Sequence, residues 1–201
     1  LQVASRNFTT HHPLLHVLML GGMICGVHKF TGSYNLGIAC YTIFQMLVIA
    51  GVFTYVIAYL RKKGVSLWIR LFALLYFAAF PVVVMFTLCS SKDAFFTAAL
   101  LLLLIALLEM GCREEEFFTS FRWQIFFVGS AVSMMLFRKN GVYAFLVLIP
   151  CLLVLQVRHR NKKYFKKLGC LLGISLAGFL VINGGLQVAL HAQAGENQEI
   201  L

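Results

Sequence analysis

The segment LFRKNGVY, residues 136–143, contains the residue types best suited to holding an anion. It places Arg138 and Lys139 side by side between two apolar runs, followed by Asn140 and Gly141. A guanidinium group binds two phosphate oxygens as a fork, and an ammonium group binds them as a point charge. A tight turn at Asn140 and Gly141 would let backbone amides join the contact. The pattern predicts a phosphate or pyrophosphate ligand, with a purely structural turn as the alternative.

A second polar segment, SSKDA at residues 90–94, holds Lys92 and Asp93, the only aspartate of the chain. Two explanations of Asp93 stay open. The first is structural: Ser90 caps the helix that follows, and the carboxylate accepts backbone amides at the positive end of the helix dipole. The second is functional: a carboxylate at the membrane surface, paired with Lys92, lies beside a ligand.

Histidines precede the first apolar run. His11 and His12 stand directly before Pro13, and His12 and His16 are four residues apart, which could place both rings on one helix face. Because no fixed carboxylate stands nearby, a divalent metal is only the lesser alternative, and no cofactor is expected. We expect His11 and His12 to hydrogen-bond a phosphate or a lipid headgroup instead.

The apolar runs that carry these segments are typical of a helical membrane protein. The 201-residue chain is 61% apolar and 12% charged, whereas soluble domains average about 25% charged. Several uncharged runs reach the roughly 20 residues that cross a bilayer, and they are continuous rather than alternating, which disfavours strands. We therefore predict an all-α polytopic membrane bundle that forms a single domain over residues 1–201, without internal repeats.

Six transmembrane helices and one non-spanning helix are predicted. Residues 1–33 form an outer segment with a juxtamembrane helix at 13–27, and residues 191–201 form an outer tail. Pro81 lies inside the second span, where a bundle tolerates a kink. The predicted spans are Tyr34–Leu60, Leu67–Cys89, Asp93–Gly111, Phe117–Phe137, Val142–Val157 and Leu168–Leu190.

The distribution of basic residues predicts the orientation in the cell membrane. Twelve of the 17 Lys and Arg residues fall in or beside loops 61–66, 112–122 and 158–167, which six spans place on one face. An excess of basic residues marks the cytoplasmic face, so SSKDA and RKNG face outward. If residues 13–27 also spanned, the basic loops would lie outside. The net charge of +10 is thus assigned to orientation and contact with membrane lipid, not to nucleic acid.

The order of these features resembles the C-type membrane glycosyltransferases, such as protein O-mannosyltransferases and lipid A aminoarabinose transferases. His-His-Pro-Leu opens an outer helix, the span GSYNLGIACYTIFQML and a basic turn follow, and an outer Asp and a later outer Arg-x-Asn-Gly come after them. The resemblance covers roughly residues 10–190 and is greatest to a bacterial branch near those enzymes. It implies a cavity for a polyprenyl-phosphate sugar donor. The residues carried over are His11, His12, Pro13, Lys92, Asp93, Arg138, Asn140 and Gly141.

Two positions depart from the family pattern: Leu14 replaces a second proline, and Asn140 stands where related enzymes often have glutamate. The family's catalytic carboxylate follows a first span that would precede Leu1, so the chain is expected to be a fragment or short form. We expect a glycosyltransferase in which Arg138 and Lys92 neutralise the leaving phosphate while an outer base deprotonates an acceptor hydroxyl. A small transporter or lipid-flipping protein and a non-catalytic scaffold are the alternatives. Nearly uncharged span centres favour the enzyme over the transporter.

Overall fold

The computed structural model describes residues 13–158 and 162–191, and every element within them is a helix. The predicted all-α class is therefore confirmed for this part of the chain. In chain order the helices are α2 (Leu14–Thr31), α3 (Tyr34–Lys62), α4 (Leu67–Ala79), α5 (Pro81–Leu88), α6 (Lys92–Cys112), α7 (Glu114–Thr119), α8 (Phe121–Phe137), α9 (Lys139–Arg158) and α10 (Lys162–Ala189).

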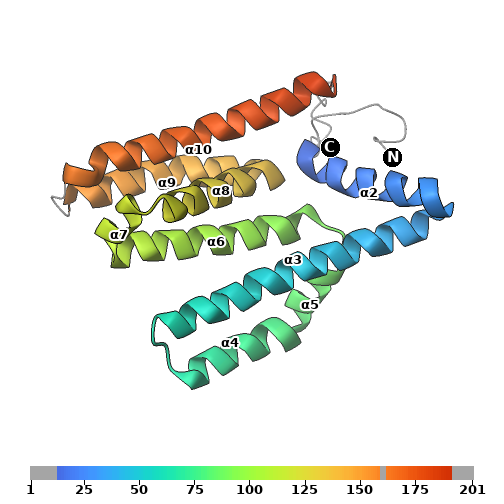
Figure 1. Ribbon diagram of the computed structural model, residues 1–201, viewed down its shortest axis with the longest axis horizontal. Coiled ribbons are helices and arrows are strands. Elements are labelled where there is room, and N and C mark those ends of the chain that lie inside the picture. Colours follow the sequence, from blue (N-terminus) through green and yellow to red (C-terminus); the bar gives the residue numbers. More distant parts are fainter. Residues whose placement is uncertain (1–12, 159–161, 192–201) are drawn as a thin grey trace, which may run out of the picture.

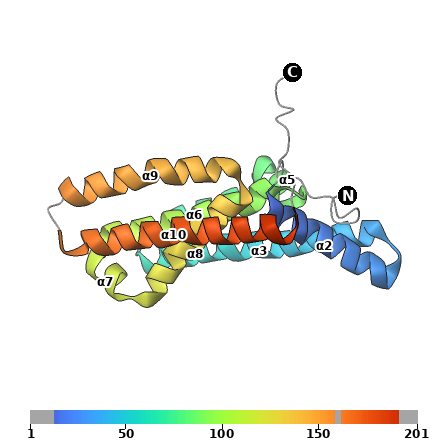
Figure 2. The same ribbon diagram turned by 90° about the horizontal axis from the view of Figure 1, so that it is seen from above.

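The long helices run side by side as an elongated bundle (Figure 1). Helix α8 is central, since it packs against α6, α9 and α10. Helix α3 packs on α6 and carries the α4–α5 pair on its flank. Seen from above, α9 lies to one side of α3 and α6 (Figure 2).

The turns of the bundle gather at two opposite ends. The basic end carries the chain reversals that follow α3, α6 and α9, and the Arg138 end carries the α5–α6 and α8–α9 connections (Figure 1). Helix α2 starts at the Arg138 end and extends away from the bundle alongside the first part of α3 (Figures 1 and 2). The segments predicted to share a membrane face therefore share an end of the fold.

Five helices of the described residues are long and apolar enough to cross a membrane, and six if α4 and α5 count as one bent span. The five are α2, α3, α6, α9 and α10. Two assignments differ from the sequence prediction. Helix α2, predicted as non-spanning, meets the length criterion, whereas α8 is a shorter apolar helix of 17 residues.

The second predicted span is broken rather than kinked. Helices α4 and α5 meet at 52°, and Phe80 between them is extended, with φ −68° and ψ 118°. Pro81 is the first residue of α5, where its missing amide hydrogen costs no helical hydrogen bond. The residue before a proline is driven out of the helical region by steric contact, which accounts for the break at Phe80.

The fourth predicted span is divided in two. It was expected to start at Phe117, but Phe117 and Phe118 belong to the short helix α7, and α8 begins at Phe121. Both phenylalanines are fully buried, and Phe118 stacks on Tyr164 of α10 at 4.9 Å between ring centroids. The break at Ser120 lets both rings enter the core beneath the start of α8.

The surface of the bundle carries many large apolar side chains. Trp68, Phe72 and Val181 are each more than 70% exposed, and many other large hydrophobic side chains on the long helices are exposed. In water such a surface would be strongly unfavourable, whereas hydrocarbon accepts it. The helix lengths and this surface are those of a membrane-embedded helical protein.

Candidate functional site

At the Arg138 end, the structure joins two of the predicted site residues. Arg138 Nη1 lies 2.9 Å from Asp93 Oδ1, and the two side chains are 40% and 29% exposed. Stacking of Phe95 on Phe137, with ring centroids 5.0 Å apart, holds the start of α6 against the end of α8. Residues 45 positions apart therefore form one ion pair, as their predicted location on one membrane face allowed.

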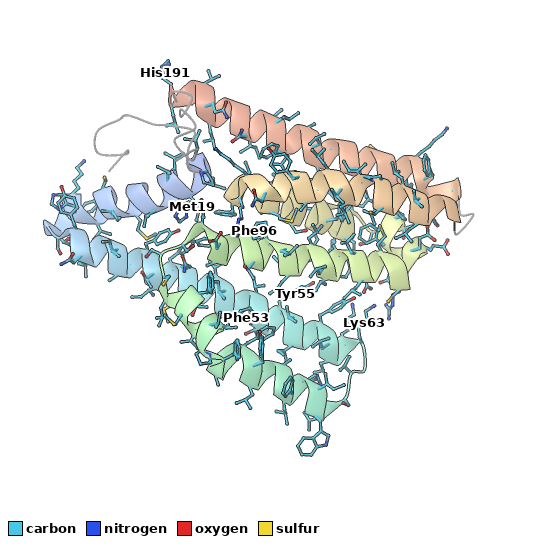
Figure 3. The ribbon with its side chains drawn as sticks, turned by 180° about the vertical axis from the view of Figure 1, so that it is seen from behind. Met19, Phe53, Tyr55, Lys63, Phe96 and His191 are labelled. Atoms are coloured by element: carbon cyan, nitrogen blue, oxygen red, sulfur yellow. The ribbon has the colours of Figure 1, made fainter. Side chains whose placement is uncertain are left out.

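Arg138 is held on two sides. It is the single residue between α8 and α9, and its backbone is extended, with φ −149° and ψ 131°. Its guanidinium carbon lies 5.5 Å from the ring centroid of Phe96, which Figure 3 shows near the start of α6. A carboxylate and an aromatic face thus both stabilise the cation. The charge of Arg138 is thus already compensated by Asp93.

Lys139 occupies a different environment from its neighbour. It lines a cavity of about 470 Å³ between the start of α2, the end of α8, the start of α9 and the last part of α10. Within the described residues it makes no ion pair. The cavity is lined by Pro13, Leu14, Met135, Leu136, Lys139, Val142, Tyr143, Phe179, Asn183 and Gln187.

The tight turn predicted at Asn140 and Gly141 is not present. Both residues lie in the first turn of α9, and the chain reverses at Arg138 alone. A Cβ atom on Gly141 would lie 2.5 Å from the carbonyl oxygen of Met134, so this glycine permits close packing of α9 on α8. Asn140 is exposed and does not line the cavity.

The start of α6 also differs in detail from the prediction. Ser91, not Ser90, is the N-cap, and its hydroxyl accepts a hydrogen bond from the Asp93 amide at 3.1 Å. Ser90 instead contacts the Thr42 hydroxyl at 3.1 Å. Asp93 pairs with Arg138 rather than with Lys92, which corrects the proposed Lys92–Asp93 pair.

The predicted histidine site is only partly visible. His11 and His12 lie outside the described residues. His16 is buried in α2, and its Nδ1 lies 3.0 Å from the Tyr41 hydroxyl of α3. Among the described residues, no group of three or more His, Cys, Asp or Glu side chains is arranged to hold a metal ion.

Sequence reasoning missed a glutamine that shapes this end. Gln45 of α3 is fully buried, and its amide nitrogen donates to the carbonyl oxygens of Thr87 at 3.1 Å and Cys89 at 2.7 Å. These bonds satisfy carbonyls at the end of α5 and fix the chain that leads into α6. The available signal was a single amide inside an otherwise apolar run.

Comparison with known proteins gives one match over nearly the whole chain. A family model covers residues 3–198. The chain belongs to the family of unknown function DUF6020. No curated protein and no solved structure matches it.

At its basic end, this DUF6020 chain has a second polar cluster that the sequence analysis did not anticipate. Glu109 of α6 is 1% exposed; it accepts a hydrogen bond from the Tyr59 hydroxyl at 2.8 Å and pairs with Lys63 at 2.5 Å. Figure 3 shows Lys63 at the end of α3, close to the end of α6. Arg113 lies 3.9 Å from the other carboxylate oxygen. The signal was the one acidic residue in the run LLLLLIALLEM.

Proposed function

We propose that this DUF6020 chain acts as a glycosyltransferase of the C-type and binds a polyprenyl-phosphate sugar donor at its Arg138 end. The observation that carries the proposal is the cavity beside Lys139, a cation without an ion-pair partner among the described residues. An unpaired ammonium group facing a cavity of ligand size suits a phosphate. The resemblance to C-type enzymes supplies the lipid-linked donor.

The proposal includes a membrane arrangement. Helices α3, α6, α8, α9 and α10 and the bent α4–α5 pair would be the six spans, and α2 would lie outside. Helix α3 has 29 residues and is about 44 Å long, whereas the hydrocarbon core is about 30 Å thick. Its first turns would therefore project from the membrane together with α2. The basic end would face the cytoplasm, as the charge rule requires.

The charged residues of the Arg138 end then have distinct roles in donor binding and sugar transfer. Lys139 binds the donor phosphate, and Arg138 stabilises the added charge when the bond between the sugar and the phosphate breaks. Asp93 holds Arg138 in place until that charge develops. The acceptor hydroxyl attacks the anomeric carbon and loses its proton to a base, and the phosphate departs with the bonding electron pair. Lys92 and the predicted His11 and His12 are further candidate donors to the phosphate.

Binding of a bare polyprenyl phosphate tests the proposal directly. The full chain, in nanodiscs of phosphatidylcholine, should bind the lipid phosphate, and Lys139→Met should weaken binding about tenfold. A lost charged contact is worth roughly 1.5–3 kcal/mol, and 1.4 kcal/mol is a factor of ten. The matched control is Lys29→Met, which removes an exposed cation of α2 and should change nothing. Equal affinity of the Lys139→Met variant and the parent would refute the phosphate site.

A further inference from the structure

The part of the cavity wall formed by α10 carries two amides on one face of that helix. Phe179, Asn183 and Gln187 follow one another at intervals of four residues, and all three line the cavity. Neither amide hydrogen-bonds within the described residues. Both side chains are partly buried. Two polar side chains that line one cavity on an otherwise apolar helix therefore point to a ligand that contacts them.

The chemistry of an amide restricts that ligand. An Asn or Gln side chain offers both a donor and an acceptor, whereas an ionised phosphate only accepts. A bare phosphate held by Lys139 offers no donor to either amide oxygen. Hydroxyl groups donate and accept, so they satisfy the whole amide. A ligand that carries hydroxyls close to its anionic group therefore fits this cavity best.

We propose that Asn183 and Gln187 recognise the sugar hydroxyls of a glycosylated lipid phosphate whose phosphate contacts Lys139. This inference rests on the proposed function and adds the residues that select the donor. The Tyr143 hydroxyl, on the same wall as Lys139, offers one further contact. A cavity of about 470 Å³ is within the range of roughly 300–1,000 Å³ typical of ligand sites. The glycerol headgroup of phosphatidylglycerol is the competing source of hydroxyls and an anion.

The experiment compares three lipids on the full chain in phosphatidylcholine nanodiscs: a polyprenyl phosphate, the same lipid bearing a hexose on its phosphate, and phosphatidylglycerol as competitor. The parent should bind the glycosylated lipid about tenfold more tightly than the bare phosphate. Asn183→Leu and Gln187→Leu should each remove most of that preference and leave the affinity for the bare phosphate unchanged. The matched control is Asn35→Leu, an exposed asparagine of α3 at the same end of the fold.

The outcomes separate this inference from the function on which it rests. If Lys139→Met binds both polyprenyl lipids more weakly, the phosphate site stands. If the Asn183 and Gln187 variants nevertheless keep the preference for the glycosylated lipid, sugar recognition by these amides is refuted. Tighter binding of phosphatidylglycerol than of the glycosylated lipid would overturn the ligand class. No effect of Lys139→Met on any lipid would refute the proposed function itself. If Leu at position 183 impairs folding, Asn183→Ala makes the same test, with a monodisperse elution profile as the criterion.

Discussion

At the scale of single residues, the Asp93–Arg138 pair places the adjacent cations Arg138 and Lys139 in different electrostatic environments. Both side chains are partly exposed, so water screens their attraction and the pair contributes only about 0–1 kcal/mol to stability. A phosphate could therefore replace the carboxylate at Arg138 at little cost. In the proposed mechanism the two cations would act in turn: Lys139 has no ion-pair partner among the described residues, whereas Arg138 would contact the phosphate only after leaving Asp93.

Neutralising Asp93 should release Arg138. We expect Asp93→Asn to bind polyprenyl phosphate several-fold more tightly than the parent, because Arg138 then lacks its carboxylate. In an Arg138→Ala background the same substitution should give no gain, and this double-mutant cycle isolates the pair. Nanodisc binding at fixed ionic strength is the measurement. A gain that persists without Arg138 would mean that Asp93 repels the ligand directly.

Glu109 is buried, so its ion pair should contribute more to stability than the partly exposed Asp93–Arg138 pair. It lies three residues from the end of α6, with Lys63 and Arg113 on either side, so it does not provide the mid-membrane charge that a transporter would need. Glu109→Ala leaves Lys63 without its carboxylate beside the core, whereas Arg113 keeps Glu116 at 3.0 Å; the substitution should cost about 3–5 kcal/mol. The Glu109→Leu/Lys63→Met double variant should cost less than Glu109→Ala.

A denaturant titration in detergent measures the free energy of unfolding of the single and the double variant. Glu115→Ala is the control, because Glu115 and Lys163 form a pair in which both side chains are largely exposed, and its loss should leave the transition unchanged. If Glu109→Ala unfolds at the same denaturant concentration as the parent, water must solvate this site, and Lys63 does not need a carboxylate partner.

Sequence reasoning worked at the residue scale where charge made a residue unusual. Asp93 stood out as the only aspartate of the chain and Arg138 as a cation on the predicted outer face, and the structure joins them. Asn183, Gln187 and Glu109 escaped notice because each lies inside a run that reads as a span. Periodicity shows which residues share a helix face, but it does not show which other helix that face meets.

At the scale of elements, charged and capping residues fixed the predicted helix ends well. Helix α3 was predicted to end at Leu60 and ends at Lys62, and α6 was predicted to start at Asp93 and starts at Lys92. Pro81 gave a local signal for the bend at Phe80, although a kink rather than a break was expected there. The break at Ser120 was not predicted, because it depends on packing. At Ser120 the chain bends so that Phe117 and Phe118 can enter a core built by α8 and α10, and no local signal encodes that partner.

Gly141 tests the α8–α9 junction, which positions Arg138 and Lys139. An added methyl group would lie 2.5 Å from the Met134 carbonyl oxygen, a backbone atom that cannot move aside cheaply. We expect Gly141→Ala to destabilise the protein by about 1–3 kcal/mol. In contrast, Gly173→Ala in α10 meets nothing within 4 Å and should be neutral or slightly stabilising. Thermal unfolding of both variants in one detergent makes the comparison, and equal midpoints would mean that α9 shifts freely on α8.

At the scale of the whole molecule, the two ends of the bundle differ in charge as the sequence predicted. Each crossing reverses the chain, so a count of apolar runs was enough to place the basic loops together and the Arg138 and Asp93 segments opposite them (Figure 1). The place of α2 was harder to predict. Its length and hydropathy satisfy the criterion for a span, yet it extends beyond the Arg138 end alongside α3.

Cysteine labelling in intact cells tests this arrangement and the role of α2 together. In a cysteine-free background, single cysteines at Pro13, Phe30, Ser66 and Asn140 sample the two ends of α2, the basic end and the Arg138 end. If α2 lies outside, a membrane-impermeant maleimide should label positions 13, 30 and 140 from outside, and position 66 only after permeabilisation. If α2 spans, positions 13 and 30 should label from opposite sides. Labelling of position 66 from outside would invert the bundle, place Lys139 in the cytoplasm and remove the basis for an outward-facing donor site.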